Sequence, residues 1–261
     1  VLFKELEEKN ITIRKDKIVE FKGDKSLDYV VFDNKDIEKF DGVFIALGTT
    51  TAINLGAALN YFEKEVIVVD ANLTTPNIGL HLGAPIVPIT LNHVIAGKAD
   101  LKDAIYEHES GTKIIPSSLS TNEFKNLRYE KLEEVIRKMK KMADFFIIDS
   151  AAGLGREAMA AINASDEIII VTNPEIPAVT DALRTIKIAE DLGKSVKGVI
   201  ITRVKRLSSE MPIENIREML ETPIIGIIPE DLTVQKALAK KDAVFHTHPK
   251  SRAAKSYKNI A

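Results

Sequence analysis

Two aspartates follow apolar runs that the sequence pattern predicts to be buried strands. Asp70 ends the run VIVVD, and Asp149 ends the run FFIID. Ligands of parallel α/β sheets bind at the carboxyl ends of the strands, so we expect both carboxylates at one edge of a sheet. Carboxylates there can hold a Mg²⁺-bound water and orient an attacking water. An aspartate after a strand also commonly caps the next turn or helix, and that alternative stays open for each of them.

Apolar runs and amphipathic segments alternate from residue 43 to the end of the chain. Strands are predicted at 43–47, 65–70, 111–116, 145–149, 167–172, 197–202 and 224–228, and helices at 49–61, 91–95, 100–105, 130–142, 157–164, 178–192 and 211–220. This alternation predicts an α/β fold with a doubly wound, mostly parallel sheet. We expect the continuous apolar strand at 43–47 to lie between the strands at 65–70 and 145–149.

The first 42 residues follow a different pattern. A short amphipathic helix with Leu2, Phe3 and Leu6 precedes short segments of alternating polarity that are separated by turn residues. This spacing predicts a small antiparallel meander. We therefore divide the chain into a small appendage at 1–42 and a main domain at 43–261.

Composition limits the class of protein. The net charge is −2, cysteine is absent, and Lys and Arg form no block that is typical of a nucleic-acid arm. Neither a signal peptide nor an apolar run long enough to span a bilayer is present. We expect a cytoplasmic protein, and because the chain begins without methionine and ends within a helical pattern, we expect both termini to be truncated.

From Thr49 onward the sequence resembles the MinD/ParA family of P-loop ATPases, which position cell-division sites or cargo. The words TTTAINLGAAL, EVIVVDAN and FFIIDSAAGLG stand in the family's order. The resemblance implies ATP or ADP with Mg²⁺ as ligands, and a homodimer and a protein partner as candidate assemblies. It assigns Asp70, Asp149 and Asn72 to catalysis, and Thr49, Asp70 and Asp149 to the metal. It assigns nucleotide contacts to Thr49, Thr50, Gly153, Asn173, Arg203, Pro229 and Asp231, with Asn173 reading adenine.

The family's phosphate-binding loop is missing from this sequence. Where relatives have KGGTGK before the threonines, Gly48 here passes directly into Thr49. That loop curls backbone N–H groups and a lysine around the phosphate, so we expect weak ATP binding and negligible hydrolysis, and enzymatic activity stays open. Without the loop, Thr49 is more simply interpreted as the N-cap of a helix that begins near Thr51.

Residues 1–50 resemble a segment of the thioredoxin-reductase family. The resemblance lies in TIRKDKIVEFKGD, LDYVVFDN and FDGVFIALGTT. The two resemblances meet at a shared Gly-Thr-Thr, which favours a chimera in which a flavoprotein fragment replaces the first strand and loop of an ATPase.

Three functions are consistent with these features. The first is a MinD-like ATPase scaffold with impaired nucleotide binding, and the second is a pseudo-ATPase that acts as a protein-interaction module. The third, a flavin or nicotinamide binder, is disfavoured because the sequence has no GxGxxG fingerprint.

Overall fold

The computed structural model describes residues 18–22, 29–32, 37–39, 43–46, 48–124, 127–139 and 142–261. The chain separates into two compact units, Val1–Phe40 and Asp41–Ala261. The two units are described separately below.

The first unit contains a three-stranded antiparallel sheet. Its strands are β1 (Ile18–Lys22), β2 (Tyr29–Phe32) and β3 (Ile37–Lys39), with β2 in the middle. The predicted antiparallel meander is therefore confirmed for these strands. The predicted helix around Leu2 and Leu6 lies outside the described residues.

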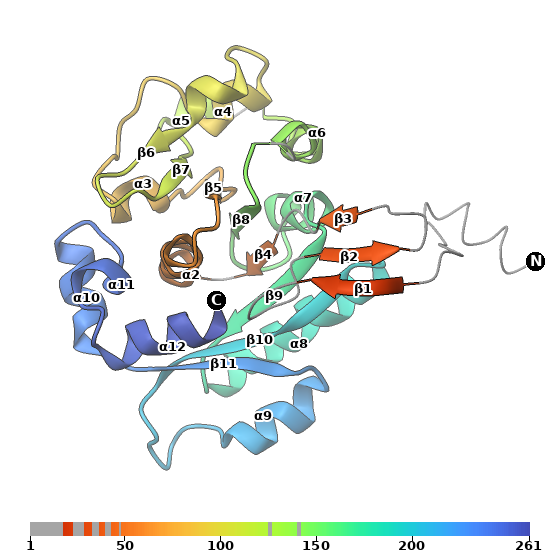
Figure 1. The fold of residues 1–261 in the computed structure, drawn as a ribbon, viewed down its shortest axis with the longest axis vertical. Helices are drawn as coiled ribbons and strands as arrows, with labels where there is room; N and C mark the ends of the chain where they lie inside the picture. Colours follow the sequence, from red (N-terminus) through yellow and green to blue (C-terminus); the bar gives the residue numbers. More distant parts are fainter. Residues whose placement is uncertain are drawn as a thin grey trace, which may run out of the picture. The chain divides into compact units, whose positions relative to one another are not determined.

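The second unit is built on an eight-stranded sheet in the order β11-β10-β9-β4-β8-β5-β7-β6 (Figure 1). All neighbouring pairs are parallel except β6 with β7. The strands are β4 (Val43–Ala46), β5 (Val66–Asp70), β6 (Tyr106–Glu107), β7 (Lys113–Ile115), β8 (Phe145–Ser150), β9 (Glu167–Thr172), β10 (Ser195–Val204) and β11 (Ile224–Pro229). Every residue of β5 is buried, as expected for a strand with helices on both faces. The predicted doubly wound α/β fold is confirmed.

The strand β4 occupies the middle of this sheet, but its neighbours differ from those predicted. It pairs with β8 on one side and β9 on the other, whereas we expected it between β5 and β8. The strands β5 and β8 instead pair directly, with Asp70 opposite Asp149. An apolar run predicts burial of a strand and leaves its order in the sheet open, because the order depends on which edges the connecting helices bring together.

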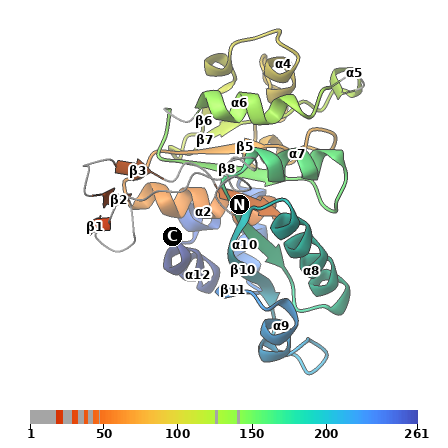
Figure 2. The same cartoon turned by 90° about the vertical axis from the view of Figure 1, so that its right-hand side faces the viewer.

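Helices cover both faces of the sheet (Figure 2). One face carries the core beneath α4 (Leu91–Ile95), α6 (Lys131–Met139), α7 (Arg156–Ala164), α8 (Ile176–Asp191) and α9 (Ile213–Leu220). The other carries the core beneath α2 (Thr49–Tyr61), α3 (Ile78–His81), α10 (Leu232–Ala239), α11 (Val244–Thr247) and α12 (Arg252–Ile260). The 3-10 helix η1 (Leu101–Ala104) and the short α5 (Thr121–Phe124) complete the described elements. The sequence pattern did not predict β6, α3, α5, α10 or α11, most of which are too short to show a helical or strand period, and it indicated α12 only as a helical pattern at the end of the chain.

Two side-chain hydrogen bonds attach the last helices to α2. Asn54, which is buried in α2, accepts from the backbone N–H of Phe245 at 3.1 Å and donates to the carbonyl of Thr50 at 2.8 Å. The hydroxyl groups of Thr51 and Tyr257 lie 3.3 Å apart, and Tyr257 is the largest fully buried side chain of the described residues. These contacts fix α2 against α11 and α12, and so fix the place where α2 begins.

We expect Asn54→Ala to lower the free energy of unfolding by about 1–3 kcal/mol, because it leaves the buried N–H of Phe245 without its acceptor. Denaturant titration followed by circular dichroism measures the change. Asn60→Ala in the same helix is the matched control, since it makes the same residue change nearer to the surface. Equal stability of the two variants would show that the Asn54 contacts contribute nothing.

Candidate functional site

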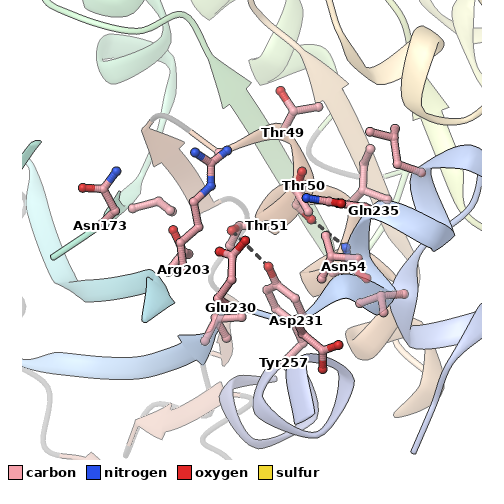
Figure 3. A pocket seen from close by; sticks show the side chains of 18 of the residues that line it. Thr49, Thr50, Thr51, Asn54, Asn173, Arg203, Glu230, Asp231, Gln235 and Tyr257 are labelled. Carbon is pink, nitrogen blue, oxygen red and sulfur yellow. Dashed lines mark hydrogen bonds between the residues drawn. The ribbon is translucent and has the colours of Figure 1, made fainter. Parts of the chain in front are cut away.

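A cleft of about 920 Å³ lies where the carboxyl ends of the parallel strands meet the helices of the α2 face. Its walls come from the start of α2 and from the segments that follow β5, β8, β9, β10 and β11. Thr49 and Thr50 lie on one side, and Asn173 and Arg203 on another (Figure 3). A cleft at this edge is the usual place for a ligand in a doubly wound sheet.

The side chain of Thr49 connects the start of α2 to the end of β8. Its hydroxyl donates to the Oδ2 atom of Asp149 at 2.5 Å. The helix α2 begins at Thr49 itself, and Gly48 occupies the N-cap position. The predicted N-cap role of Thr49 is therefore wrong. Its hydroxyl donates to a carboxylate on β8, and the N-cap residue is Gly48, which has no side chain to cap the helix. A Cβ atom at Gly48 would lie 3.1 Å from Val171 Cγ1, so a larger residue fits poorly there.

The carboxyl group of Asp149 is buried next to the cleft: Asp149 itself is not among the described lining residues, but its partner Thr49 and the following residue Ser150 are. Burial raises the pKa of Asp149 to about 7, although the hydrogen bond from Thr49 acts in the opposite direction. Its Oδ1 atom is buried and has no hydrogen-bond partner among the described residues. A buried carboxylate oxygen without a partner is costly, so this atom is suited to receive a donor such as a metal-bound water.

Asp70 lies beside Asp149. Both of its carboxylate oxygens accept hydrogen bonds from backbone N–H groups in the segment that follows β5. Oδ2 accepts from the backbone N–H groups of Asn77 and Ile78, each at 3.0 Å, and Oδ1 accepts from that of Asn72 at 3.3 Å. Burial first, and the charge of Asp149 second, raise the pKa of Asp70 well above its usual value. Asn72 lines the cleft, and its side-chain oxygen holds Thr75. Asp70 therefore organises the loop after β5, and its role in catalysis stays a prediction.

The residues assigned to the base lie across the cleft from α2. Asn173, Arg203, Pro229 and Asp231 all line it. The Oδ1 atom of Asn173 is buried without a partner among the described residues. Arg203 has a φ of +56°, which is uncommon for a residue other than glycine, and its side chain extends into the cleft in Figure 3. Backbone conformations of this kind cluster at functional sites.

Of the predicted nucleotide-binding residues, Asp231 has a second role in the fold and Gly153 lies outside the described lining of the cleft. Asp231 is the N-cap of α10, where its Oδ1 accepts from the backbone and hydroxyl of Thr233. Gly153, with a φ of +81°, lies in an exposed turn after β8 and is not among the described residues that line the cleft.

The structure adds lining residues beyond those assigned individually to the nucleotide or the metal above. They are Thr51, Asn54, Glu230, Gln235 and Tyr257, which Figure 3 shows around the start of α2 and of α10. The helical pattern noted at the end of the sequence is the helix of Tyr257, in which the buried positions Ala253, Ala254 and Tyr257 recur at helical spacing. Nothing in the local sequence indicated that this helix would reach the cleft.

Mg²⁺ would find a partial set of oxygen ligands here. The hydroxyl of Thr49 and the unpartnered Oδ1 of Asp149 fit a hydrated Mg²⁺, whereas the oxygens of Asp70 are already occupied by N–H groups. No group of three or more His, Asp or Glu side chains among the described residues could hold a metal alone. This is consistent with the usual binding of Mg²⁺ through one or two protein oxygens, water and a phosphate.

The fold and the cleft define an α/β protein of the P-loop NTPase class. Residues 49–244 match the family model described as the CobQ/CobB/MinD/ParA nucleotide binding domain, and the chain belongs to this MinD/ParA family of ATPases. An ATP-binding protein of Methanocaldococcus jannaschii is 42% identical over 213 residues, which cover 82% of this chain and 81% of that protein. The septum site-determining protein MinD of Synechocystis is 30% identical over 221 residues, 82% of each chain.

Solved structures give the same assignment. MinD of Pyrococcus horikoshii in complex with Mg-ADP superposes with a TM-score of 0.81 at 32% identity, and the match covers 84% of this chain and 93% of that one. The cell division ATPase MinD of Pyrococcus furiosus superposes with the same TM-score at 30% identity. Among the residues that the structure describes, every helix falls short of the length and apolar character needed to cross a membrane.

We expect the free energy of unfolding to fall as the pH rises from about 4 to about 7. The folded state holds the proton of Asp149 up to about pH 7, whereas an unfolded aspartate loses it near pH 4. The stabilisation that this proton provides is therefore complete below the unfolded pKa and is lost as the pH rises to the folded pKa. Asp149→Asn should reduce this fall, by up to about 4 kcal/mol, as measured by denaturant titration at several pH values.

Asp191→Asn, at an exposed position, is the matched control and should keep the wild-type slope. Since Asp70 also has a raised pKa, part of the slope should remain in Asp149→Asn. An unchanged slope in that variant would contradict the pKa assigned to Asp149.

Proposed function

We propose that the protein is a MinD-like nucleotide-binding scaffold that binds ATP weakly and hydrolyses it negligibly. The observation that carries this proposal is the connection between β4 and α2. β4 ends at Ala46 and α2 begins at Thr49, so only Leu47 and Gly48 join them. A phosphate-binding loop needs several consecutive N–H groups and a lysine between strand and helix, and two residues do not provide them.

The base side of the cleft supports retention of the nucleotide pocket. Asn173, Arg203 and Pro229 line one wall, as the family resemblance implies for contacts to adenine. Thr49 and Asp149 provide oxygens for Mg²⁺. ATP would therefore find partners for its base and metal but few for its phosphates.

We further propose that residues 1–42 derive from a thioredoxin-reductase-like protein and that β4 replaces the family's first strand. The family match begins at Thr49, directly after the seam that the sequence indicates. The central place of β4 in the sheet supports this account, because a foreign apolar strand can fill such a position through backbone hydrogen bonds alone.

We expect insertion of Lys-Gly-Gly-Thr-Gly-Lys between Gly48 and Thr49 to strengthen ATP binding from the millimolar toward the micromolar range. Each restored charge-assisted contact contributes about 1.5–3 kcal/mol, and about 4 kcal/mol separates the two ranges. Calorimetry measures the affinity, and phosphate release measures turnover.

A Gly-Gly-Ser-Gly-Gly-Ser insertion at the same point is the matched control, because it restores the length without the lysines. It should leave the affinity near that of the natural sequence. Micromolar ATP binding by the unmodified protein, or a turnover in it that Asp149→Ala abolishes, would contradict the proposed function.

A second candidate function is a protein-interaction module that assembles as a homodimer. We give the name apolar rim to exposed Leu and Ile side chains on the segments that follow the strands' carboxyl ends. They are Leu80, Ile86, Leu119, Leu154, Ile176, Leu207 and Leu232. Ile86 is 89% exposed and Leu232 is 68% exposed. Exposed apolar groups concentrated on one edge of a protein mark an interaction surface, and a second copy would cover the rim and the cleft together.

We expect the double variant Ile86→Ser and Leu154→Ser to shift the protein from dimer to monomer in sedimentation velocity, because it removes apolar area from the rim. Leu192→Ser is the control, since Leu192 is an exposed leucine that lies just before β10, at the opposite edge of the sheet. Wild-type protein that stays monomeric at every concentration would rule out the homodimer.

A further inference from the structure

The described lining of the cleft carries more negative than positive charge. Its carboxylates are Glu175, Glu210, Glu230, Asp231 and Asp242. Its permanent cations are Arg203 and Lys205. An excess of carboxylates repels a polyanion, and the repulsion acts over distances shorter than the screening length of the salt solution.

Hydrogen bonds keep two of these carboxylates ionised. Burial raises the pKa of Glu210, but the backbone N–H groups of Lys205, Arg206 and Leu207 outweigh it, so that the pKa lies below its usual value. In the same way, burial raises the pKa of Asp231, but hydrogen bonds from the N–H and hydroxyl of Thr233 and from the N–H of Ala253 outweigh it and lower the pKa. The negative charge of the cleft is therefore present at neutral pH.

The end of the cleft that would receive phosphates offers little to offset that charge. The hydroxyl of Thr49 already donates to Asp149, and Asn54 is engaged with Thr50 and Phe245. A triphosphate placed there would find the first N–H groups of α2 and the hydroxyl of Thr50 as donors, and the carboxyl group of Asp149 lies next to it, bonded to Thr49.

The rest of the lining suits an uncharged, flat molecule with hydrogen-bonding edges. Apolar surfaces come from Val171, Pro174, Ile228, Pro229, Val234 and Leu238. Neutral hydrogen-bonding groups come from Thr50, Asn72, Thr202 and Gln235. The buried Oδ1 of Asn173 has no partner in the described structure and needs a donor such as an exocyclic amine.

We propose that the cleft selects an uncharged purine nucleoside over its phosphorylated forms. This inference rests on the proposed function, because it places the base where the nucleotide pocket places it. The affinity should then fall from the nucleoside to the triphosphate, whereas a nucleotide-binding site usually shows the opposite order. Each added phosphate brings further repulsion from the cleft carboxylates without a compensating contact.

Calorimetric titration of the full chain with adenosine, AMP, ADP and ATP, each with and without Mg²⁺, tests the inference. We expect adenosine to bind at least about tenfold more tightly than ATP without Mg²⁺, from repulsion between charges about 10 Å apart in screened water. Raising the salt concentration should narrow this difference, because salt screens the repulsion of ATP and leaves adenosine unaffected.

Paired variants locate the effect. Glu175→Gln should strengthen ATP binding without changing that of adenosine, while Glu190→Gln, at an exposed position far along the same helix, should change neither. Asn173→Ala should weaken adenosine binding about tenfold, whereas the exposed Asn163→Ala should not. Circular dichroism of each variant checks the fold.

Weak ATP binding together with adenosine binding that is equally weak or absent would overturn this inference and leave the proposed function standing. Micromolar ATP binding would overturn the proposed function. An adenosine affinity that Asn173→Ala leaves unchanged would also overturn the inference, because binding would then occur elsewhere.

Discussion

The pairing of β4 with β8 and β9 is the constraint on which the rest of the structure depends. It joins the strands β9, β10 and β11 to the strands β8, β5, β7 and β6 in a single sheet. It also sets the direction of α2, because only two residues separate the end of β4 from the start of α2. The cleft exists because α2 starts at the carboxyl edge of the sheet, beside the ends of β8 and β9.

The first residue of α2 contributes to the chemistry beside the cleft. The hydroxyl of Thr49 lies within hydrogen-bonding distance of Asp149, at the end of β8. That contact satisfies one carboxylate oxygen and leaves the other buried without a described partner. The carboxyl group bonded to Thr49 is therefore buried, and because its pKa is raised to about 7, it carries a full negative charge only above that pH.

The sequence predicted the fold class and most of the longer elements. The helix predicted at residues 49–61 has the observed bounds, and the strands at 145–149 and 167–172 are within one residue of those observed. Local periodicity predicts elements of this length because burial repeats along them. It did not predict that β4 lies beside β9, since strand order depends on contacts distant in sequence.

The candidate site was predictable where residues follow strands, and less so elsewhere. Asn173 and Arg203 lie in the cleft because the ends of parallel strands share an edge. Asp231 was assigned to the nucleotide, yet the structure gives it a capping bond as well, which a strand-end pattern alone does not distinguish. The carboxylates that give the cleft its charge are spread over segments from residue 175 to residue 242, and only the folded chain brings them together.

The hydrogen bonds between α2 and the last helices connect residues that the ribosome adds to the chain at very different times. Asn54 and Phe245 are 191 positions apart, and Thr51 and Tyr257 are 206 apart. On a ribosome that adds about 5–20 residues each second, α2 would wait about ten seconds or longer for these partners. The wall of the cleft closes only when they arrive, so a nascent chain displays the start of α2 and its apolar surroundings to chaperones before any ligand can be enclosed.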